Sequence, residues 1–390
     1  MSREADAVLA AVQDLAPVIR ERATEAETQR RVPEASIKEL EATGFFRLLQ
    51  PTSFGGYAAD PEIFYRAVKA VAAACGSTGW VASVVGVHAW QLALFPAQAQ
   101  QEVWGADPNV RVSSSYAPTG RITPVEGGFR VSGRWSFSSG CDHADWVFLG
   151  GLITGPDGLP TDMRTFLLPR PDYRVDDVWD TVGLRGSGSN DIVVEDAFVP
   201  EHRTLSFANT SDLRCPGQEL NPEPLYRLPF ASVFTSTITT PIIGIAEGAY
   251  AAYTAATRER FRVSYGQKVT DDPFAQVRIA RAASEIDAAW TLLSRNIGEQ
   301  YALAGRGEEI PVDLRIRTRR DQVLGTERAI GAVDLLFENA GGHALKVGNV
   351  VQRGWRDAHA GRVHAANDPE RALVMFGQDA LGITVQDTMI

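Results

Sequence analysis

The stretch VSGRWSFSSGCDHADWVFLGG, residues 131–151, places serines, a cysteine and a histidine between two runs that alternate as β-strands do. Ser138, Ser139 and Gly140 are residue types that favour tight turns, so a polar hairpin is one interpretation. The other interpretation is that the turn forms one wall of a binding site. The rest of the chain has to decide, because serine-rich turns are common by themselves.

Short alternating runs continue on both sides of this stretch. From about residue 108, segments such as RVSSSYAP and DIVVEDAFVP alternate in character and are separated by Gly, Pro and Asp. This spacing predicts antiparallel strands arranged as a barrel or sandwich.

Helical patterns flank the strand-rich segment. On its N-terminal side, apolar residues recur at helical spacing from Val8 to Ile19, and further helices are expected over 60–75 and 77–95. On its C-terminal side, Asp272 and Pro273 predict the start of a helix that ends near Gly305. Another helix is expected from after Pro311 to the glycines at 341–342. The sequence therefore predicts an α+β chain with an N-terminal helical domain (1–107), a β domain (108–215) and a C-terminal helical bundle (216–390).

Composition excludes several classes of function. The 390 residues are 44% hydrophobic and 22% charged with a net charge of −10, so no basic surface for nucleic acid is expected. Cys75, Cys141 and Cys215 are widely spaced and form no CxxC pair, which is typical of a reducing compartment and of neither a disulfide scaffold nor a zinc site. The N-terminus carries charges throughout, and no apolar run is long enough for a bilayer. We expect a soluble cytoplasmic protein without a metal.

The glycine-rich run at residues 186–188 could be mistaken for a dinucleotide-binding loop. A strand pattern follows Gly186, Ser187 and Gly188, whereas the nucleotide fingerprint needs a helix there. The chain therefore has no motif for binding a nicotinamide cofactor.

Three motifs on this helical–β–helical frame resemble the acyl-CoA dehydrogenase fold. They are WSFSSG at 135–140, VGLRGSGSNDIVVEDAFVP at 182–200 and RDAHAGRVHAANDP at 356–369. In that fold the WSFSSG turn lies against the flavin ring, so the resemblance favours the binding-site interpretation of the opening stretch.

The fold hosts two chemistries, and residue types separate them. A dehydrogenase needs a carboxylate base near the flavin to remove a proton from an acyl thioester. The resemblance implies two positions for that base, at about Gly348 and within Ser236–Thr240, and neither has a carboxylate. Histidines are present instead, at His88, His359 and His364. A lone histidine on an apolar helix is more often a core residue than a catalytic one.

The histidines resemble those of the two-component, flavin-dependent aromatic monooxygenases built on this fold. The resemblance implies that His88 and Ser114 hold a substrate phenol oxygen, that Ser139 bonds flavin N5, and that His364 closes over the flavin. Trp80, with Val84 and Trp90, would supply an apolar wall for a large ligand, although a core helix has the same character. The residues that the resemblance assigns to flavin binding are Ser114, Phe137, Ser138, Ser139, Arg262, Gly342, His343, His364 and Ala365.

The resemblance also implies how the protein assembles and what it needs. Arg262, in a run where Tyr265 replaces the family's Phe, would grip the flavin phosphate across a subunit boundary of a homotetramer. Reduced FMN or FAD would arrive by diffusion from a separate NADH-dependent flavin reductase.

Runs such as SSGCDHADW and DTVGLRGSGSN resemble in particular the family members of actinobacterial steroid degradation. They imply ortho-hydroxylation of the phenolic A-ring of a 9,10-secosteroid to a catechol. Three alternatives stay open: an acyl-CoA dehydrogenase with a relocated base, a non-catalytic flavin-binding or assembly protein, and a sister oxygenase acting on a small phenol, a sulfur heterocycle or an amino sugar.

Overall fold

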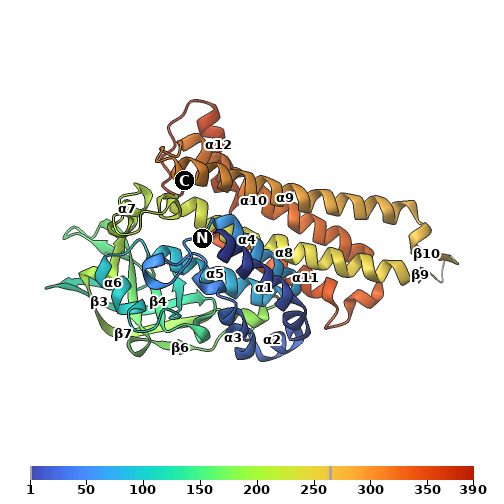
Figure 1. The fold of residues 1–390 in the computed structure, drawn as a ribbon, viewed down its shortest axis with the longest axis horizontal. Coiled ribbons are helices and arrows are strands. Elements are labelled where there is room, and N and C mark those ends of the chain that lie inside the picture. The colour runs from blue at the N-terminus through green and yellow to red at the C-terminus, as the bar shows by residue number, and fades with distance from the viewer. Residues whose placement is uncertain (1, 263–265) are drawn as a thin grey trace.

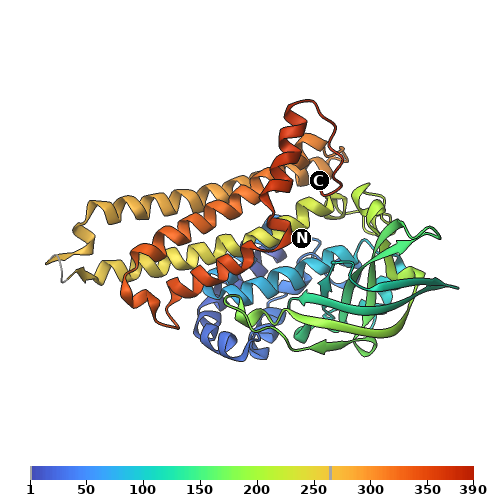
Figure 2. The ribbon, with the colours of Figure 1, turned by 180° about the vertical axis from the view of Figure 1, so that it is seen from behind.

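The computed structural model describes residues 2–262 and 266–390. Figure 1 shows a body that contains the N-terminal helices and the strands, from which a bundle of long helices extends to one side. Figure 2 shows from behind that the C-terminal segments run along this bundle and back to the body. The order is helical, then β, then helical, as expected for an acyl-CoA dehydrogenase-like α+β fold.

The N-terminal helices surround a helix that is buried on nearly every side. This helix, α5, carries apolar or small residues all round, so it has no solvent face. Gly79 permits a close approach to α4, because a Cβ there would lie 2.4 Å from the Ala72 backbone. The bounds are α1 (Ser2–Glu21), α2 (Ala23–Gln29), α3 (Glu34–Ala42), α4 (Pro61–Ala74), α5 (Gly76–Leu92) and α6 (Ala97–Trp104).

The strands form two four-stranded sheets. One has the order β1-β4-β5-β8 and the other β2-β3-β7-β6. Pairing is antiparallel except between β1 and β4, which are parallel because the chain crosses to the other sheet and returns between them. The bounds are β1 (Val112–Ser115), β2 (Arg121–Val125), β3 (Gly128–Ser138), β4 (Trp146–Thr154), β5 (Pro160–Pro169), β6 (Arg174–Asp176), β7 (Asn190–Pro200) and β8 (Thr204–Ser206).

The opening stretch is not a hairpin. Its two strands, β3 and β4, belong to different sheets, and the polar residues between them form the corner where the chain changes sheet. The corner includes a 3₁₀ turn, η3 (Cys141–His143), and Gly140, whose absent Cβ would lie 2.8 Å from Val85 of α5. The corner is therefore pressed against the buried helix, which a hairpin tip in solvent would not be.

The C-terminal part contains the long helices. Asp272 caps α9 by accepting a hydrogen bond from the Phe274 amide at 2.9 Å, which confirms the predicted helix start. Two short strands lie at the far tip of the bundle (Figure 1). The bounds are α7 (Phe207–Ser211), α8 (Phe230–Glu259), β9 (Phe261–Arg262), β10 (Gln267–Lys268), α9 (Pro273–Gly305), α10 (Val312–Asn339), α11 (Val350–Arg362) and α12 (Pro369–Ala380).

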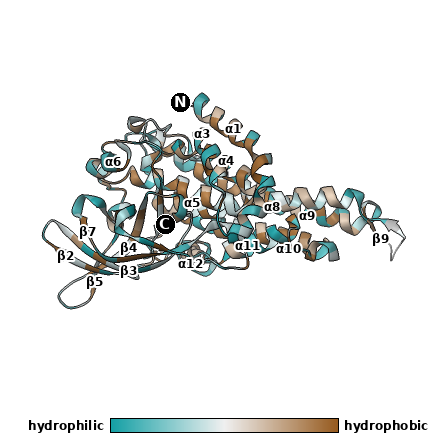
Figure 3. Cartoon of the chain, turned by 90° about the horizontal axis from the view of Figure 1, so that it is seen from below, coloured by the Kyte–Doolittle hydropathy of each residue, from teal (hydrophilic) through white to brown (hydrophobic). Residues whose placement is uncertain are grey.

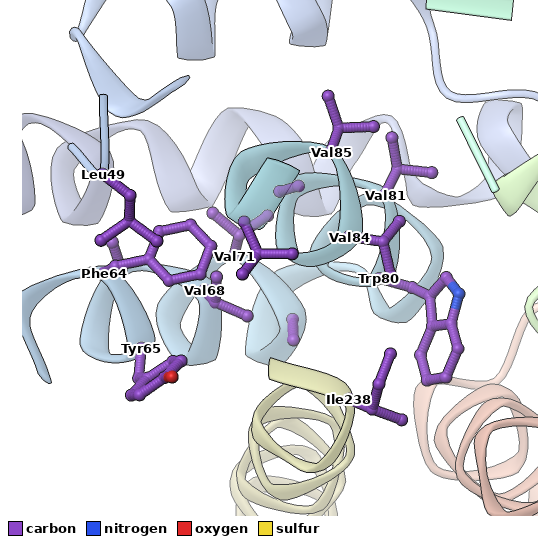
Figure 4. Packing of buried hydrophobic residues seen from close by; sticks show 14 of the residues in the cluster. Leu49, Phe64, Tyr65, Val68, Val71, Trp80, Val81, Val84, Val85 and Ile238 are labelled. Atoms are coloured by element: carbon purple, nitrogen blue, oxygen red, sulfur yellow. The ribbon is translucent and has the colours of Figure 1, made fainter. Parts of the chain in front are cut away.

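The two helical segments share one hydrophobic core. Buried residues of α1, α4 and α5 belong to the same cluster as those of α8, α10 and α11. Figure 4 shows Trp80 of α5 beside Ile238 of α8, with Val81, Val84 and Val85 on the same helix. Figure 3 shows hydrophobic segments around α4 and α5 and hydrophilic ones on outward-facing turns. A second cluster, which includes Trp135, fills the space between the sheets. Within the described residues, no helix is long and apolar enough to cross a membrane.

Candidate functional site

His88 lies near the C-terminal end of α5 and is 1% exposed. Its Nδ1 is 2.6 Å from the Val112 carbonyl oxygen, which can only accept, so Nδ1 carries the hydrogen. The Nε2 atom is buried and has no hydrogen-bond partner among the described residues. Burial lowers the pKa of His88 to about 4, so the imidazole is neutral near pH 7. His88 therefore presents an unused acceptor inside the protein.

Aromatic side chains surround this acceptor and extend away from it. The His88 ring is 5.6 Å from the Phe148 ring and 6.3 Å from the Tyr116 ring, edge-on in both cases. Tyr116 lies 5.3 Å from Phe234, which stacks on Phe230 at 5.2 Å. These rings form an apolar wall suited to an aromatic ligand.

A short polar chain lies beside the wall. The Tyr116 hydroxyl donates to Gln91 Oε1 and also interacts with the Ser114 hydroxyl. Gln91 follows His88 by three positions on α5, so both side chains lie on one face of that helix. Ser114 thus lies next to Tyr116 and two strand residues beyond Val112, whose carbonyl orients His88.

Trp80 connects the helix to the serine turn. Its indole N–H donates to Ser139 Oγ at 3.0 Å, and Ser139 Oγ also lies 2.7 Å from Ser189 Oγ. The Trp80 ring is 5.9 Å from the His364 ring, and His364 is 6.4 Å from Phe234. A continuous series of contacts therefore joins Ser139, Trp80 and His364 to the wall around His88.

His364 has the opposite arrangement of its ring nitrogens. Its Nδ1 accepts from the Ala366 amide at 3.1 Å, so this nitrogen carries no hydrogen and Nε2 carries it in the neutral ring. Burial lowers the pKa of His364, which favours the neutral form. His364 caps the 3₁₀ turn η12 (Ala365–Asn367), and Ala365 lies exposed next to it. The site thus has one imidazole that accepts and one that donates.

The end of β3 has a backbone conformation that non-glycine residues seldom adopt. Phe137 has a φ of 71°, and the pairing of β3 with β7 shifts between Trp135 and Ser138. The shift leaves the Phe137 ring exposed and 6.3 Å from the Trp179 ring. It also buries Ser138, whose hydroxyl has no partner among the described residues. Strained backbone with unused polar atoms is typical of a ligand-binding wall.

The glycine-rich run 183–189 packs directly behind the serine turn. Leu184 N donates to the Asp357 carboxylate at 2.7 Å, and Gly186 N donates to Ser77 Oγ at 3.1 Å. The Gly140 amide donates to the Ser187 carbonyl at 3.0 Å. The loop is therefore fixed by α11, α5 and the turn.

The structure brings together only some of the predicted site residues. Trp80, His88, Ser114, Ser138, Ser139 and His364 lie along the described wall, with Phe137 and Ala365 at its edge. Gly342 and His343 are exposed in η11 (Gly342–Leu345), after the end of α10. The side chain of Arg262, and all of Tyr265, lie outside the described residues.

Two further histidines, His143 and His359, have structural partners. His143 Nδ1 lies 3.1 Å from the Glu34 carboxylate and ties the corner to α3. His359 Nε2 lies 2.8 Å from the Asp334 carboxylate and links α11 to α10.

Gly348 does not lie at the aromatic wall. It lines an outer groove of about 620 Å³ together with Val182, Val347 and Arg356. None of the residues of the wall lines this groove, so a missing carboxylate at Gly348 says nothing about the chemistry at His88. The Ser236–Thr240 hydroxyls are buried within α8, where Thr237 and Thr240 bond to carbonyls one turn back.

Several residues of the site were not predicted from the sequence. Tyr116 follows Ser114 by two residues, Gln91 follows His88 by three, and Ser189 ends the glycine-rich run. The helical spacing from His88 to Gln91 is a usable signal, whereas nothing in the local pattern relates Ser189 to Ser139.

The donor set fits a flavin and an aromatic ligand. Ser138 Oγ and His88 Nε2 are buried without partners among the described residues, so each has capacity for a polar group of a ligand. Aromatic rings between them supply flat apolar surfaces. Among the described residues, no three His, Cys, Asp or Glu side chains are grouped closely enough for a metal ion.

Comparisons with known proteins show the family of the chain. The model of the acyl-CoA dehydrogenase N-terminal domain matches residues 2–107, and that of the C-terminal domain matches residues 236–369. The chain is 57% identical over 377 residues to the flavin-dependent monooxygenase, oxygenase subunit HsaA, of Rhodococcus jostii (strain RHA1), covering 96% of this chain and 98% of that one. The crystal structure of 3-HSA hydroxylase from Rhodococcus sp. RHA1 has a TM-score of 0.95 and 55% identity, covering 98% and 99%. XiaF from Streptomyces sp. in complex with FADH2 has a TM-score of 0.89 and 27% identity, covering 98% and 97%.

Fold and domain matches define a protein of the acyl-CoA dehydrogenase type. The chain belongs to the flavin-dependent monooxygenases, of which it is an oxygenase component. It is therefore a flavin-dependent enzyme.

Proposed function

We propose that this oxygenase hydroxylates the phenolic A-ring of 3-hydroxy-9,10-secoandrosta-1,3,5(10)-triene-9,17-dione ortho to its hydroxyl, giving a catechol. The observation that carries the proposal is the buried, unpartnered Nε2 of His88 inside an aromatic wall. A phenol donates one hydrogen bond and is otherwise apolar, which matches one acceptor among rings. The relative named 3-HSA hydroxylase supports the secosteroid as substrate.

His88 would orient the substrate by accepting its phenolic hydrogen. A neutral imidazole with a pKa of about 4 is a weak base, but a phenolate next to it raises that pKa because opposite charges favour the charged form. The Val112 carbonyl then stabilises the imidazolium through Nδ1–H. Moving the hydrogen toward His88 enriches the ortho carbon in electrons. Ser114 lies on the neighbouring strand and would share the phenolic oxygen.

Ser138, Ser139 and Phe137 would hold the flavin ring at the end of β3. Reduced flavin, with O₂, supplies the electrophilic oxygen atom. Ser139, which accepts a hydrogen bond from Trp80, would also bond flavin N5. His364, on the other side of the Trp80 ring, would donate its Nε2–H to the flavin. Trp80 and the phenylalanines exclude water from the reacting atoms.

The flavin phosphate would be bound by a neighbouring subunit of a homotetramer. Gly342, His343 and Arg262 occur after the far ends of α10 and α8. Phe234 lies at the wall, and the helix continues for 25 residues to Glu259, about 38 Å at 1.5 Å per residue. One chain therefore cannot bring both ends to a single flavin, which supports a site composed of two chains.

The partner component would be a NADH-dependent flavin reductase that delivers reduced FMN or FAD by diffusion. The glycine-rich run 183–189 leads into β7 and not into a helix, so it does not form a nicotinamide-binding loop. Cys75, Cys141 and Cys215 are buried and unpaired, which supports a cytoplasmic location.

The test is oxygen uptake and product analysis with reduced FMN or FAD, the secosteroid and a panel of small phenols. Wild-type protein should convert the secosteroid to its catechol in preference to the small phenols. His88→Ala should slow hydroxylation by about 10²- to 10⁴-fold while flavin oxidation continues. Both variants should therefore release hydrogen peroxide in place of product, but only Ser139→Ala should also weaken the binding of reduced flavin.

Two controls remove side chains of the same type elsewhere. His202→Ala changes a histidine paired with Glu102 at the surface, and Ser36→Ala changes a buried serine of α3. Both variants should hydroxylate the secosteroid at the wild-type rate and yield. Hydroxylation at wild-type rate and yield by His88→Ala and Ser139→Ala would disprove the assigned roles.

A further inference from the structure

Three serine hydroxyls form a row behind the turn that faces the proposed flavin position. Ser139 Oγ lies 2.7 Å from Ser189 Oγ, which lies 2.8 Å from Ser187 Oγ. Ser187 and Ser189 are 2% and 3% exposed, so water does not compete for these bonds. The row starts at Trp80, whose indole N–H donates to Ser139 at 3.0 Å.

The hydrogen bonds along this row can run in either of two directions, because each hydroxyl has one hydrogen to donate. An indole N–H can only donate, so Ser139 Oγ already accepts one bond from Trp80. If the hydroxyls donate outward, from Ser139 to Ser189 to Ser187, then Ser139 retains a free lone pair. If they donate inward, Ser139 accepts twice and has a free hydrogen instead. The direction therefore decides whether Ser139 offers an acceptor or a donor.

The two oxidation states of a flavin need opposite partners. Nitrogen N5 carries a hydrogen in reduced flavin and is a donor, whereas in oxidised flavin it has a lone pair and is an acceptor. The outward direction therefore suits reduced flavin. Donation from Ser139 to Ser189 also makes Ser139 Oγ a better acceptor, because hydrogen bonds in a chain polarise one another.

We propose that Ser189, backed by Ser187, is a positioning residue that keeps the Ser139 hydroxyl oriented as an acceptor for the N5–H group of reduced flavin. The row thereby makes the protein bind reduced flavin more tightly than oxidised flavin. This inference rests on the proposed function, since it needs a flavin beside Ser139.

The backbone around the row is suited to such a role. Gly188 has a φ of 52°, where a Cβ would also lie 2.8 Å from the Asp142 carboxylate. Ser187 N donates to the Leu184 carbonyl at 2.9 Å, and the Ser187 carbonyl accepts from Gly140. Ser187 and Ser189 are therefore fixed relative to the turn, so their hydroxyls can rotate while their oxygens stay in place.

The experiment measures the dissociation constants of reduced and oxidised FMN, without oxygen, for the full-length protein and its variants. We expect Ser189→Ala to raise the dissociation constant of reduced FMN by about 3- to 10-fold and that of oxidised FMN by less. The midpoint potential of the bound flavin should become more negative, by about 30 mV for each tenfold loss of preference. Ser187→Ala should give a smaller change in the same direction. In ¹⁵N NMR, the N5 signal of labelled reduced FMN should shift in the same order.

Ser189→Thr keeps the hydroxyl and should restore the preference, which a packing role alone would not predict. Ser36→Ala removes an equally buried serine that accepts from Arg22 and should leave both constants unchanged. Equal losses for both oxidation states, or an unchanged N5 signal in folded Ser189→Ala and Ser187→Ala, would overturn the proposal. Failure of wild-type protein to bind reduced FMN would instead reject the proposed function, and this inference with it.

Discussion

His88 and His364 show how single hydrogen bonds determine the chemistry of a residue. The Val112 carbonyl places the hydrogen of His88 on Nδ1, and the Ala366 amide leaves the hydrogen of His364 on Nε2. Both rings are kept neutral by desolvation. Under the proposed function, the same residue type therefore supplies an accepting imidazole for the substrate and a donating one for the flavin.

Burial of His88 predicts an acid-sensitive contribution to stability. Its pKa is lowered from 6.5 to about 4 in the folded protein, so below pH 6.5 the unfolded chain binds a proton that the folded chain does not. The free energy of unfolding should therefore fall between pH 6.5 and pH 4, by up to about 3 kcal/mol from this group. Urea unfolding at pH 7.5, 6 and 5 would measure it. His88→Gln, which is neutral throughout, should remove this contribution to the profile, whereas His202→Gln should not. A parallel profile for His88→Gln and wild type would contradict this assignment.

At the scale of elements, the joint between α11, the loop 183–188 and α5 supports the serine turn. Asp357 of α11 accepts from Leu184 N, and a Cβ on Gly183 would lie 2.1 Å from the Arg356 carbonyl oxygen. Arg356 Nη1 also donates to the Val182 carbonyl at 2.8 Å. Only glycine permits this approach of the loop to the helix, so the joint depends on backbone contacts.

Burial raises the pKa of Asp357 from 3.8 to about 6, against the opposing effects of the Leu184 amide and Arg356. The folded protein then binds a proton more readily than the unfolded chain, and this group makes stability rise as pH falls from about 7 to 4. Asp357→Asn keeps an acceptor for Leu184 without the charge. It should raise the free energy of unfolding at pH 8 by up to about 3 kcal/mol and remove this pH dependence. Asp357→Ala, which loses the acceptor, should destabilise the protein. If Asp357→Asn is less stable than wild type at pH 8, the charge is needed by Arg353 and Arg356.

At the scale of the whole molecule, the long bundle separates two sets of residues that one flavin would need. The wall lies at one end of α8 and the segment with Arg262 at the other, about 38 Å apart along the helix. Assembly is the physical way to bring such ends together, because a neighbouring chain can place its bundle tip beside the wall.

Mixing two defective variants tests this arrangement. Ser139→Ala and Arg262→Ala should each bind reduced flavin weakly. After subunit exchange, one mixed site would combine the intact Ser139 of one chain with the intact Arg262 of the other, so binding and hydroxylation should partly recover. Arg258→Ala, which removes an exposed cation of α8 four residues before Arg262, should bind reduced flavin normally. Sedimentation should show four chains of 42.3 kDa each. Absence of recovery despite exchange, or a fully active monomer, would rule out a site shared between chains.

Local patterns were sufficient for the elements and for part of the site. The Asp272–Pro273 start of α9 and the strand-like apolar run of β4 follow from interactions within a few residues, which a sequence displays directly. The motifs around His88, Ser139 and His364 likewise indicated the family. The sequence could not show that β3 and β4 lie in different sheets, because a hairpin and a corner between sheets have the same turn residues. Tertiary packing alone placed Ser189 against Ser139 and His364 against Trp80, contacts of 50 residues and more along the chain. Hydrogen-bond direction and burial at these atoms depend on distant partners, so no local spacing encodes them.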